Sequence, residues 1–124
     1  MDPRLAMKTL GAGRVLVGLG LVAAPAALGR PWIGEAADDA GGQVALRALG
    51  IRDALLGFMA VHVAGSADPM VAARWSAAIA VCDVVDGGAT AAAGGVLPPR
   101  SQAVTVLALS TAVTGFAIAS ALRD

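Results

Sequence analysis

The stretch Ala48-Leu49-Gly50-Ile51-Arg52-Asp53-Ala54-Leu55-Leu56-Gly57 places a positive and a negative charge side by side in an apolar run. On the insertion scale, one charged residue at the centre of a membrane helix costs about 2.5–3.5 kcal/mol, whereas each Leu, Ile, Val or Phe returns only about 0.3–0.6 kcal/mol. Arg52 and Asp53 therefore make residues 43–65 a poor membrane segment on their own. Such a segment needs counter-charges from neighbouring helices, and the fold depends on where they are.

The composition indicates a membrane protein. Of the 124 residues, 57% are hydrophobic and 15% are charged, and the mean hydropathy is +0.75. Only 3% are aromatic, so Ala, Gly, Val and Leu carry the apolar content, as in helices that pack closely in lipid. A formal net charge of zero gives no electrostatic footprint for nucleic acid. One Cys and one His cannot form a structural zinc site by themselves, so we expect no metal and no cofactor.

Four apolar stretches approach the ~20 residues that a helix needs to cross the hydrocarbon of a bilayer. Short connectors rich in Pro, Gly or charge separate them. We predict an all-α, four-transmembrane-helix bundle that forms a single domain over residues 1–124, with spans at about 9–29, 43–65, 70–93 and 101–122. The N-terminal basic residues, the apolar run and Ala24-Pro25-Ala26 also resemble a cleaved signal peptide. Arg14, inside that apolar run, favours a retained first span.

The basic residues near the span ends indicate an orientation. One side would carry Arg4, Lys8, Arg74 and Arg123, and the other Arg30, Arg47 and Arg100. By the excess of Lys and Arg on cytoplasmic loops, this predicts a multi-pass protein of the plasma membrane with both termini in the cytoplasm.

The counter-charges for Arg52 and Asp53 are present in the other spans. The third span carries Asp83 and Asp86, three residues apart on one helical face, and the first carries Arg14. If the second and third spans form a tight antiparallel hairpin, Arg52 lies level with Asp83.

Helical periodicity predicts that these charges face the bundle interior. At 100° per residue, Arg14, Asp53 and Asp83 each project from a stripe of mainly small residues, and such stripes let helix backbones approach each other in lipid. The aligned residues are Gly11, Gly18, Leu21 and Pro25; Leu46, Gly50, Gly57, Ala60 and Ala64; and Ala72, Ser76, Ile79, Gly87 and Thr90. The formal charge of Arg14, Arg52, Asp53, Asp83 and Asp86 is minus one. One carboxyl is therefore protonated, or Arg47 or a bound cation completes the set.

The pattern Arg-Ala-Leu-Gly-Ile-Arg-Asp-Ala-Leu-Leu-Gly, followed by Arg74-Trp75 and Asp83-x-x-Asp86, resembles an uncharacterised family of small four-span membrane proteins from high-GC bacteria and fungi. More distantly, the chain is similar to the DoxX-like four-helix membrane proteins. The resemblance implies four helices and an integral-membrane location, and it brings no established activity.

Three functions fit these residues, beside a purely structural role of the charges in fixing helix register. The first, which we favour, is binding or transport of a lipophilic small molecule or a proton at Arg14, Arg52, Asp53, Asp83 and Asp86. Because four helices of this length enclose little space, a conducting path would need a homo-oligomer. The second is a membrane-embedded acid/base enzyme acting on a lipid or isoprenoid, with Asp53, Asp83 and Asp86 as catalytic candidates. The third is an accessory subunit that binds another membrane protein. Loss of binding, of product or of a copurifying partner on Asp-to-Asn substitution would distinguish the three.

Overall fold

The chain is helical along almost its whole length, as its composition predicts. The computed structural model describes residues 1–124. They form α1 (Pro3–Ala23), α2 (Pro25–Ile33), the 3-10 helix η1 (Gly34–Ala37), α3 (Ala40–Val63), α4 (Pro69–Ala92) and α5 (Ser101–Ala121), with no strand. The local sequence determines where two of the helices, α1 and α4, begin. Asp2 and Asp68 each accept a hydrogen bond from the backbone N–H two residues later, and Pro3 and Pro69 follow them. Proline fits the first helical turn because that turn needs no donor from it.

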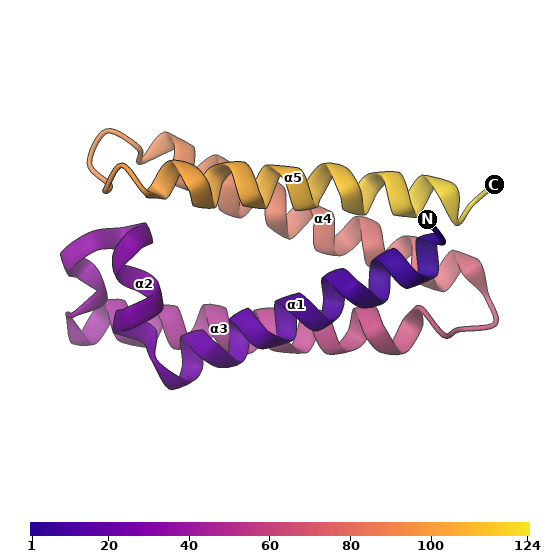
Figure 1. Ribbon diagram of the computed structural model, residues 1–124, viewed down its shortest axis with the longest axis horizontal. Helices are drawn as coiled ribbons and strands as arrows, with labels where there is room; N and C mark the ends of the chain where they lie inside the picture. Colours follow the sequence, from indigo (N-terminus) through magenta and orange to yellow (C-terminus); the bar gives the residue numbers. More distant parts are fainter.

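The first helix lies earlier in the chain than the predicted span 9–29. α1 ends at Ala23, and Ala24 leaves the helical conformation with φ −136° and ψ 64° before Pro25 begins α2. The proline ring disfavours helical geometry in the residue before it and removes a backbone donor. The chain therefore turns at Ala24, and α2 is a separate short helix (Figure 1).

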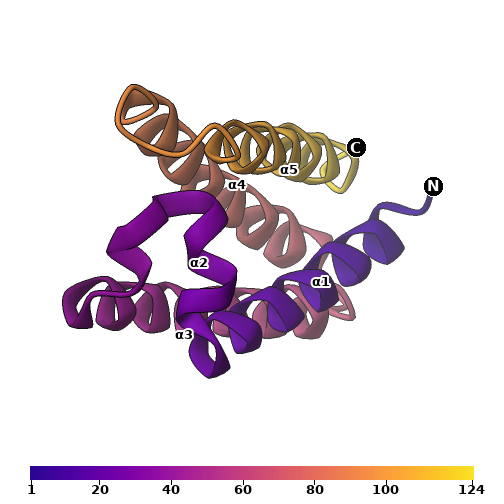
Figure 2. The same cartoon turned by 60° about the vertical axis from the view of Figure 1, so that its left-hand side comes forward.

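The four long helices are arranged as two pairs. α1 packs along α3, and α4 packs along α5, while contacts between the two pairs are much sparser (Figures 1 and 2). α3 and α4 are joined by the short turn after Val63, but they contact each other at few points and do not form the tight hairpin that we expected. α2 lies at the far end from this turn, beside α3 and α5.

Glycines bring the backbones of α1 and α3 into direct contact at two points. A Cβ added to Gly11 would lie 2.7 Å from the Gly57 carbonyl oxygen, and one added to Gly50 would lie 2.6 Å from the Gly18 carbonyl oxygen. Any side chain at these positions would therefore force the helices apart. In the second pair, the Ser76 hydroxyl donates to a backbone carbonyl of α5 at 2.8 Å. Both pairs use the small-residue packing that close helix contact requires.

The inward and outward faces of the helices differ as the periodicity predicts. All members of the three stripes named above are buried. The outward faces carry large, exposed apolar side chains on every long helix, among them Leu16, Val17, Leu55, Phe58, Val81, Val85, Val106 and Val113. By length and composition, α1 and α5 could each cross a membrane, with mean hydropathies of 1.5 and 1.8. α3 and α4 are longer, at 24 residues each, but each contains three charged side chains.

Candidate functional site

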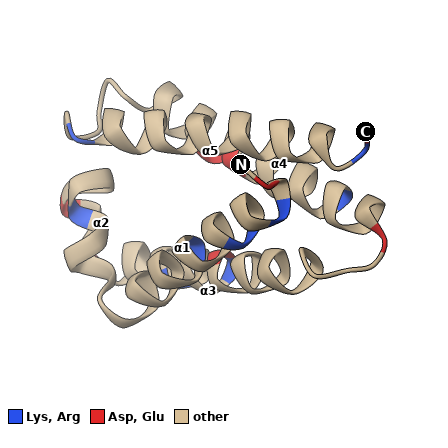
Figure 3. Cartoon of the chain, turned by 45° about the vertical axis from the view of Figure 1, so that its right-hand side comes forward, with Lys and Arg blue, Asp and Glu red and all other residues tan.

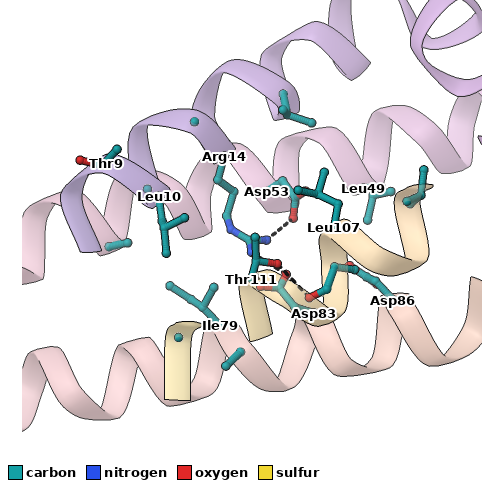
Figure 4. Close-up of a pocket in the computed structure, with 18 of the residues that line it drawn as sticks. Thr9, Leu10, Arg14, Leu49, Asp53, Ile79, Asp83, Asp86, Leu107 and Thr111 are labelled. Atoms are coloured by element: carbon teal, nitrogen blue, oxygen red, sulfur yellow. Dashed lines mark hydrogen bonds and ion pairs between the residues drawn. The ribbon is translucent and has the colours of Figure 1, made fainter. Parts of the chain in front are cut away.

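The charged residues singled out in the sequence meet between the two helix pairs. Figure 3 shows charges near the helix ends and a second group midway along the helices. In this group Arg14 extends from α1 toward α3 and α4 (Figure 4). Its Nη1 donates to Asp53 Oδ1 at 3.1 Å, and its Nη2 donates to Asp83 Oδ1 and Oδ2 at 2.5 and 2.6 Å. One guanidinium thus joins three helices.

The second arginine holds the remaining carboxylate. Arg52 Nη2 donates to Asp86 Oδ2 and, at 3.4 Å, to Asp53 Oδ1, while Nη1 lies 3.4 Å from Asp86 Oδ1. A tight hairpin would have placed Arg52 level with Asp83, whereas the structure pairs Arg52 with Asp86, almost one turn further along α4. The difference arises because α3 and α4 diverge after their turn, so equal depth does not follow from counting residues on either side of it. Arg14 takes Asp83 instead.

Asp53 is the carboxylate without an arginine of its own. Its Oδ1 accepts from both Arg14 and Arg52, and its Oδ2 accepts no hydrogen bond. Arg47 does not complete the set, because its side chain is exposed and its Nε donates to the Val22 carbonyl oxygen at 3.2 Å. The cluster therefore holds two guanidinium groups against three carboxyl groups. Its ion pairs leave a formal charge of minus one when every carboxyl is ionised.

An apolar cavity of about 440 Å³ lies beside the cluster. All five α-helices contribute to its wall, and most of its lining is hydrophobic or small. Arg14, Asp53, Asp83 and Asp86 supply the charged part of the lining. Figure 4 shows Leu107 and Thr111 of α5 next to these side chains. The volume falls in the range of about 300–1,000 Å³ that small-molecule sites occupy.

The short helix α2 closes one end of the cavity. Leu28, Pro31 and Trp32 line it there. The Trp32 indole Nε1 donates to Thr90 Oγ1 at 3.0 Å, and that hydroxyl donates to the Asp86 carbonyl oxygen at 2.8 Å. Helical periodicity within the four predicted spans does not predict these α2 residues as part of the site. The sequence signal that could have predicted their position is Ala24-Pro25, because the helix breaks there and the chain turns before it reaches Trp32.

Two other ionisable residues of the long helices, His62 and Arg74, do not line the cavity. His62 is exposed at the end of α3 and stacks on Phe58, with ring centroids 6.3 Å apart. Arg74 is exposed near the start of α4. No three His, Cys, Asp or Glu side chains lie close enough together to hold a metal ion.

No family model, no curated protein and no solved structure matches this chain. The resemblance to a four-span family stays a prediction, and the functional argument rests on the geometry of the cluster and the cavity.

Proposed function

We propose that this chain is an integral membrane protein whose four long helices cross the bilayer, and that it binds a lipophilic small molecule in the cavity beside the Arg14 cluster. The single observation that carries the binding proposal is the combination of an apolar cavity of about 440 Å³ with one charged wall. Such a site accepts a hydrocarbon body and orients it by its polar end.

The outer surface supports the membrane part of the proposal. Large apolar side chains are exposed on all four long helices. Such exposure is energetically unfavourable in water but not in lipid. The exposed charges Lys8, Arg47 and Arg74 lie near helix starts, within about 11 Å of the ends at 1.5 Å per residue. Among the mid-helix charges, Arg52 is the most exposed, at 37% of its side chain, and it is paired with Asp86.

The ion pairs supply what α3 and α4 lack as isolated membrane segments. Arg52 and Asp53 on α3 and Asp83 and Asp86 on α4 all have a partner of opposite charge. Charges in a membrane helix are tolerated where they face the bundle interior and pair with one another. We infer that these two helices enter the bilayer together with α1 and α5, not singly.

We place the protein in the plasma membrane with both termini in the cytoplasm. Both termini lie at the same end of the molecule in Figure 1, as an even number of crossings requires. Arg4, Lys8, Arg74 and Arg123 belong to that end, against Arg30, Arg47 and Arg100 at the other. The small excess of basic residues favours a cytoplasmic side for the termini. Cysteines introduced at Asp2 and Asp124 should react with a membrane-impermeant thiol reagent only after the membrane is permeabilised. Labelling of these cysteines in intact cells would contradict a cytoplasmic location of the termini.

The geometry favours binding over the two alternative functions. Asp83 and Asp86 each have both oxygens engaged by an arginine, which suits a fixed acceptor better than a carboxyl that must exchange a proton during catalysis. An accessory subunit would present its small-residue stripes to a partner, but here the stripes are buried in contacts within the chain.

Trp32 gives an internal reporter for the binding test, because it lines the cavity and Trp75 does not. In a Trp75→Phe background in lipid nanodiscs, adamantanol should change Trp32 emission in a saturable way. Ala108→Phe fills the cavity from α5 and should abolish the change. Ala117→Phe, on the exposed face of the same helix, is the matched control and should leave it intact. If neither adamantanol nor its charged analogues produce a saturable response, the binding proposal fails.

A further inference from the structure

We propose that the ligand of this cavity is a lipophilic monocation with an N–H donor, such as a protonated amine, and that Asp53 is its counter-ion. The inference rests on the proposed binding function and specifies the chemical class of the ligand.

The first step is the charge balance of the cluster. Arg14 and Arg52 face Asp53, Asp83 and Asp86, so one negative charge is left over when all carboxyls are ionised. A low-dielectric surrounding makes an unbalanced charge costly. One added positive charge, from a proton or from a ligand, removes that cost.

The second step is that no basic side chain of this chain supplies the missing charge. Arg47 bonds to a backbone carbonyl of α1 instead. Lys8 and Arg74 are exposed near the helix starts, and none of these three residues forms an ion pair. A balancing positive charge would therefore have to come from outside the chain.

The third step identifies the atom that would receive it. Arg14 engages both oxygens of Asp83, and Arg52 engages both oxygens of Asp86. Asp53 has one oxygen shared by the two arginines and one, Oδ2, that accepts no hydrogen bond. Because Asp53 also lines the cavity, an ammonium N–H at its Oδ2 would form a charge-assisted hydrogen bond while the body of the ligand stays among apolar side chains.

The same geometry disfavours an anionic ligand. Carboxylates already hold the Nη atoms of both guanidinium groups, and the one buried donor without a partner is Arg52 Nε. An anion at the Nη atoms would have to displace a carboxylate, and it would add to an excess of negative charge. A neutral ligand would fill the apolar volume without balancing the cluster.

The cavity wall indicates how such a molecule reaches the site. Leu10 and Val17 of α1 and Leu107 of α5 line the cavity, and all three are also exposed, Leu107 by 63%. α1 and α5 come from different pairs and contact each other sparsely. A lipophilic cation dissolved in the membrane would therefore enter from the side, between α1 and α5.

The test compares three probes with one adamantane cage and different charges: adamantylamine, which is protonated at neutral pH, adamantanol and adamantane carboxylate. Each is titrated into the Trp75→Phe protein in phosphatidylcholine nanodiscs, with protein-free nanodiscs to correct for partition. We expect the amine to bind about tenfold or more tightly than the alcohol, as for one charge-assisted hydrogen bond, and the carboxylate to bind most weakly.

Variants then assign the preference to one residue. Asp53→Asn should abolish the preference for the amine, so that the amine and the alcohol bind with equal affinity. Asp39→Asn, at an exposed carboxylate that makes no side-chain cap bond, should keep the preference. Equal binding of amine and alcohol by the unsubstituted cluster overturns the inference but leaves the proposed binding function standing, and this result does not depend on how the variants fold. An amine preference that survives in folded Asp53→Asn also overturns it. Binding of none of the three probes overturns the binding function itself.

Discussion

The contact between α1 and α3 gives a sharp prediction about stability, because it depends on backbone approach at single glycines. In Gly18→Ala the new Cβ would lie 2.5 Å from the Ala54 nitrogen and 3.1 Å from the Ala54 Cα, and still closer to the Gly50 carbonyl oxygen. Ordinary carbon contacts lie near 3.5–4.0 Å. The helices must therefore part by about 1 Å at this point, which forfeits a quarter to a half of the dispersion energy of the atoms in contact.

A second glycine of the same helix isolates this effect. Gly13 has no atom within 4 Å of an added Cβ, so Gly13→Ala changes helix propensity without a collision. Both substitutions replace Gly by Ala in one helix, and the propensity gain of about 1 kcal/mol is common to them. The difference between the two variants is therefore the cost of the collision, about 1–3 kcal/mol for an overpacked contact. We expect Gly18→Ala to be less stable than Gly13→Ala by that amount.

The assay is reversible unfolding in mixed micelles of increasing SDS content, followed by tryptophan emission. A difference of about 1–3 kcal/mol corresponds to a change of about 5- to 150-fold in the unfolding equilibrium constant at equal SDS, since 1.4 kcal/mol is tenfold. Equal midpoints and slopes for the two variants would refute the close backbone contact, and with it the assignment of α1 and α3 as a tightly packed pair.

Three further predictions concern individual side-chain contacts. Hydrogen bonds from Arg30 hold the pKa of Asp38 below its ordinary value. The stability that this pair contributes is therefore present above the Asp38 pKa of the unfolded chain and is lost as the pH falls through the Asp38 pKa of the folded protein. Arg30→Gln should raise the pKa of Asp38 in a carboxyl NMR titration. Ser76→Ala removes a buried bond to α5 and should lower the free energy of unfolding by about 0.5–1.5 kcal/mol in the SDS assay. Trp32→Phe removes the bond from α2 to α4 and should speed amide hydrogen exchange in α2, whereas Trp75→Phe should not.

The helical class and the inward faces could be predicted because they follow from local periodicity. Asp53 and Gly57, four residues apart, must share a face of any helix, and both turn inward. The members of the charged cluster followed in the same way from the cost of leaving a charge without a partner. That the helices cross a membrane remains a proposal, since only α1 and α5 are apolar enough to do so by composition.

The pairing of helices could not be predicted in this way. Counting outward from the turn after Val63 assumes that helices adjacent in sequence pack together. Gly11, Gly18, Gly50 and Gly57 instead draw α1 against α3, because only these two helices allow backbone contact at two matched points. The assignment of Arg52 to Asp86 follows from that tertiary choice, which periodicity within one helix does not contain.

The contrast between the two kinds of contact explains why a cavity lies where the charges are. Within each pair, small residues let the helices touch, whereas between the pairs Arg14 reaches from α1 to Asp83 through a long side chain. The guanidinium groups thus join the pairs while holding their backbones apart. Well-packed apolar residues often stabilise such a position as well as a buried ion pair does, or better. Stability alone therefore gives little reason to place two arginines and three aspartates there. The proposed binding site does give such a reason, because charges on one wall of an apolar cavity would select the polar end of the ligand.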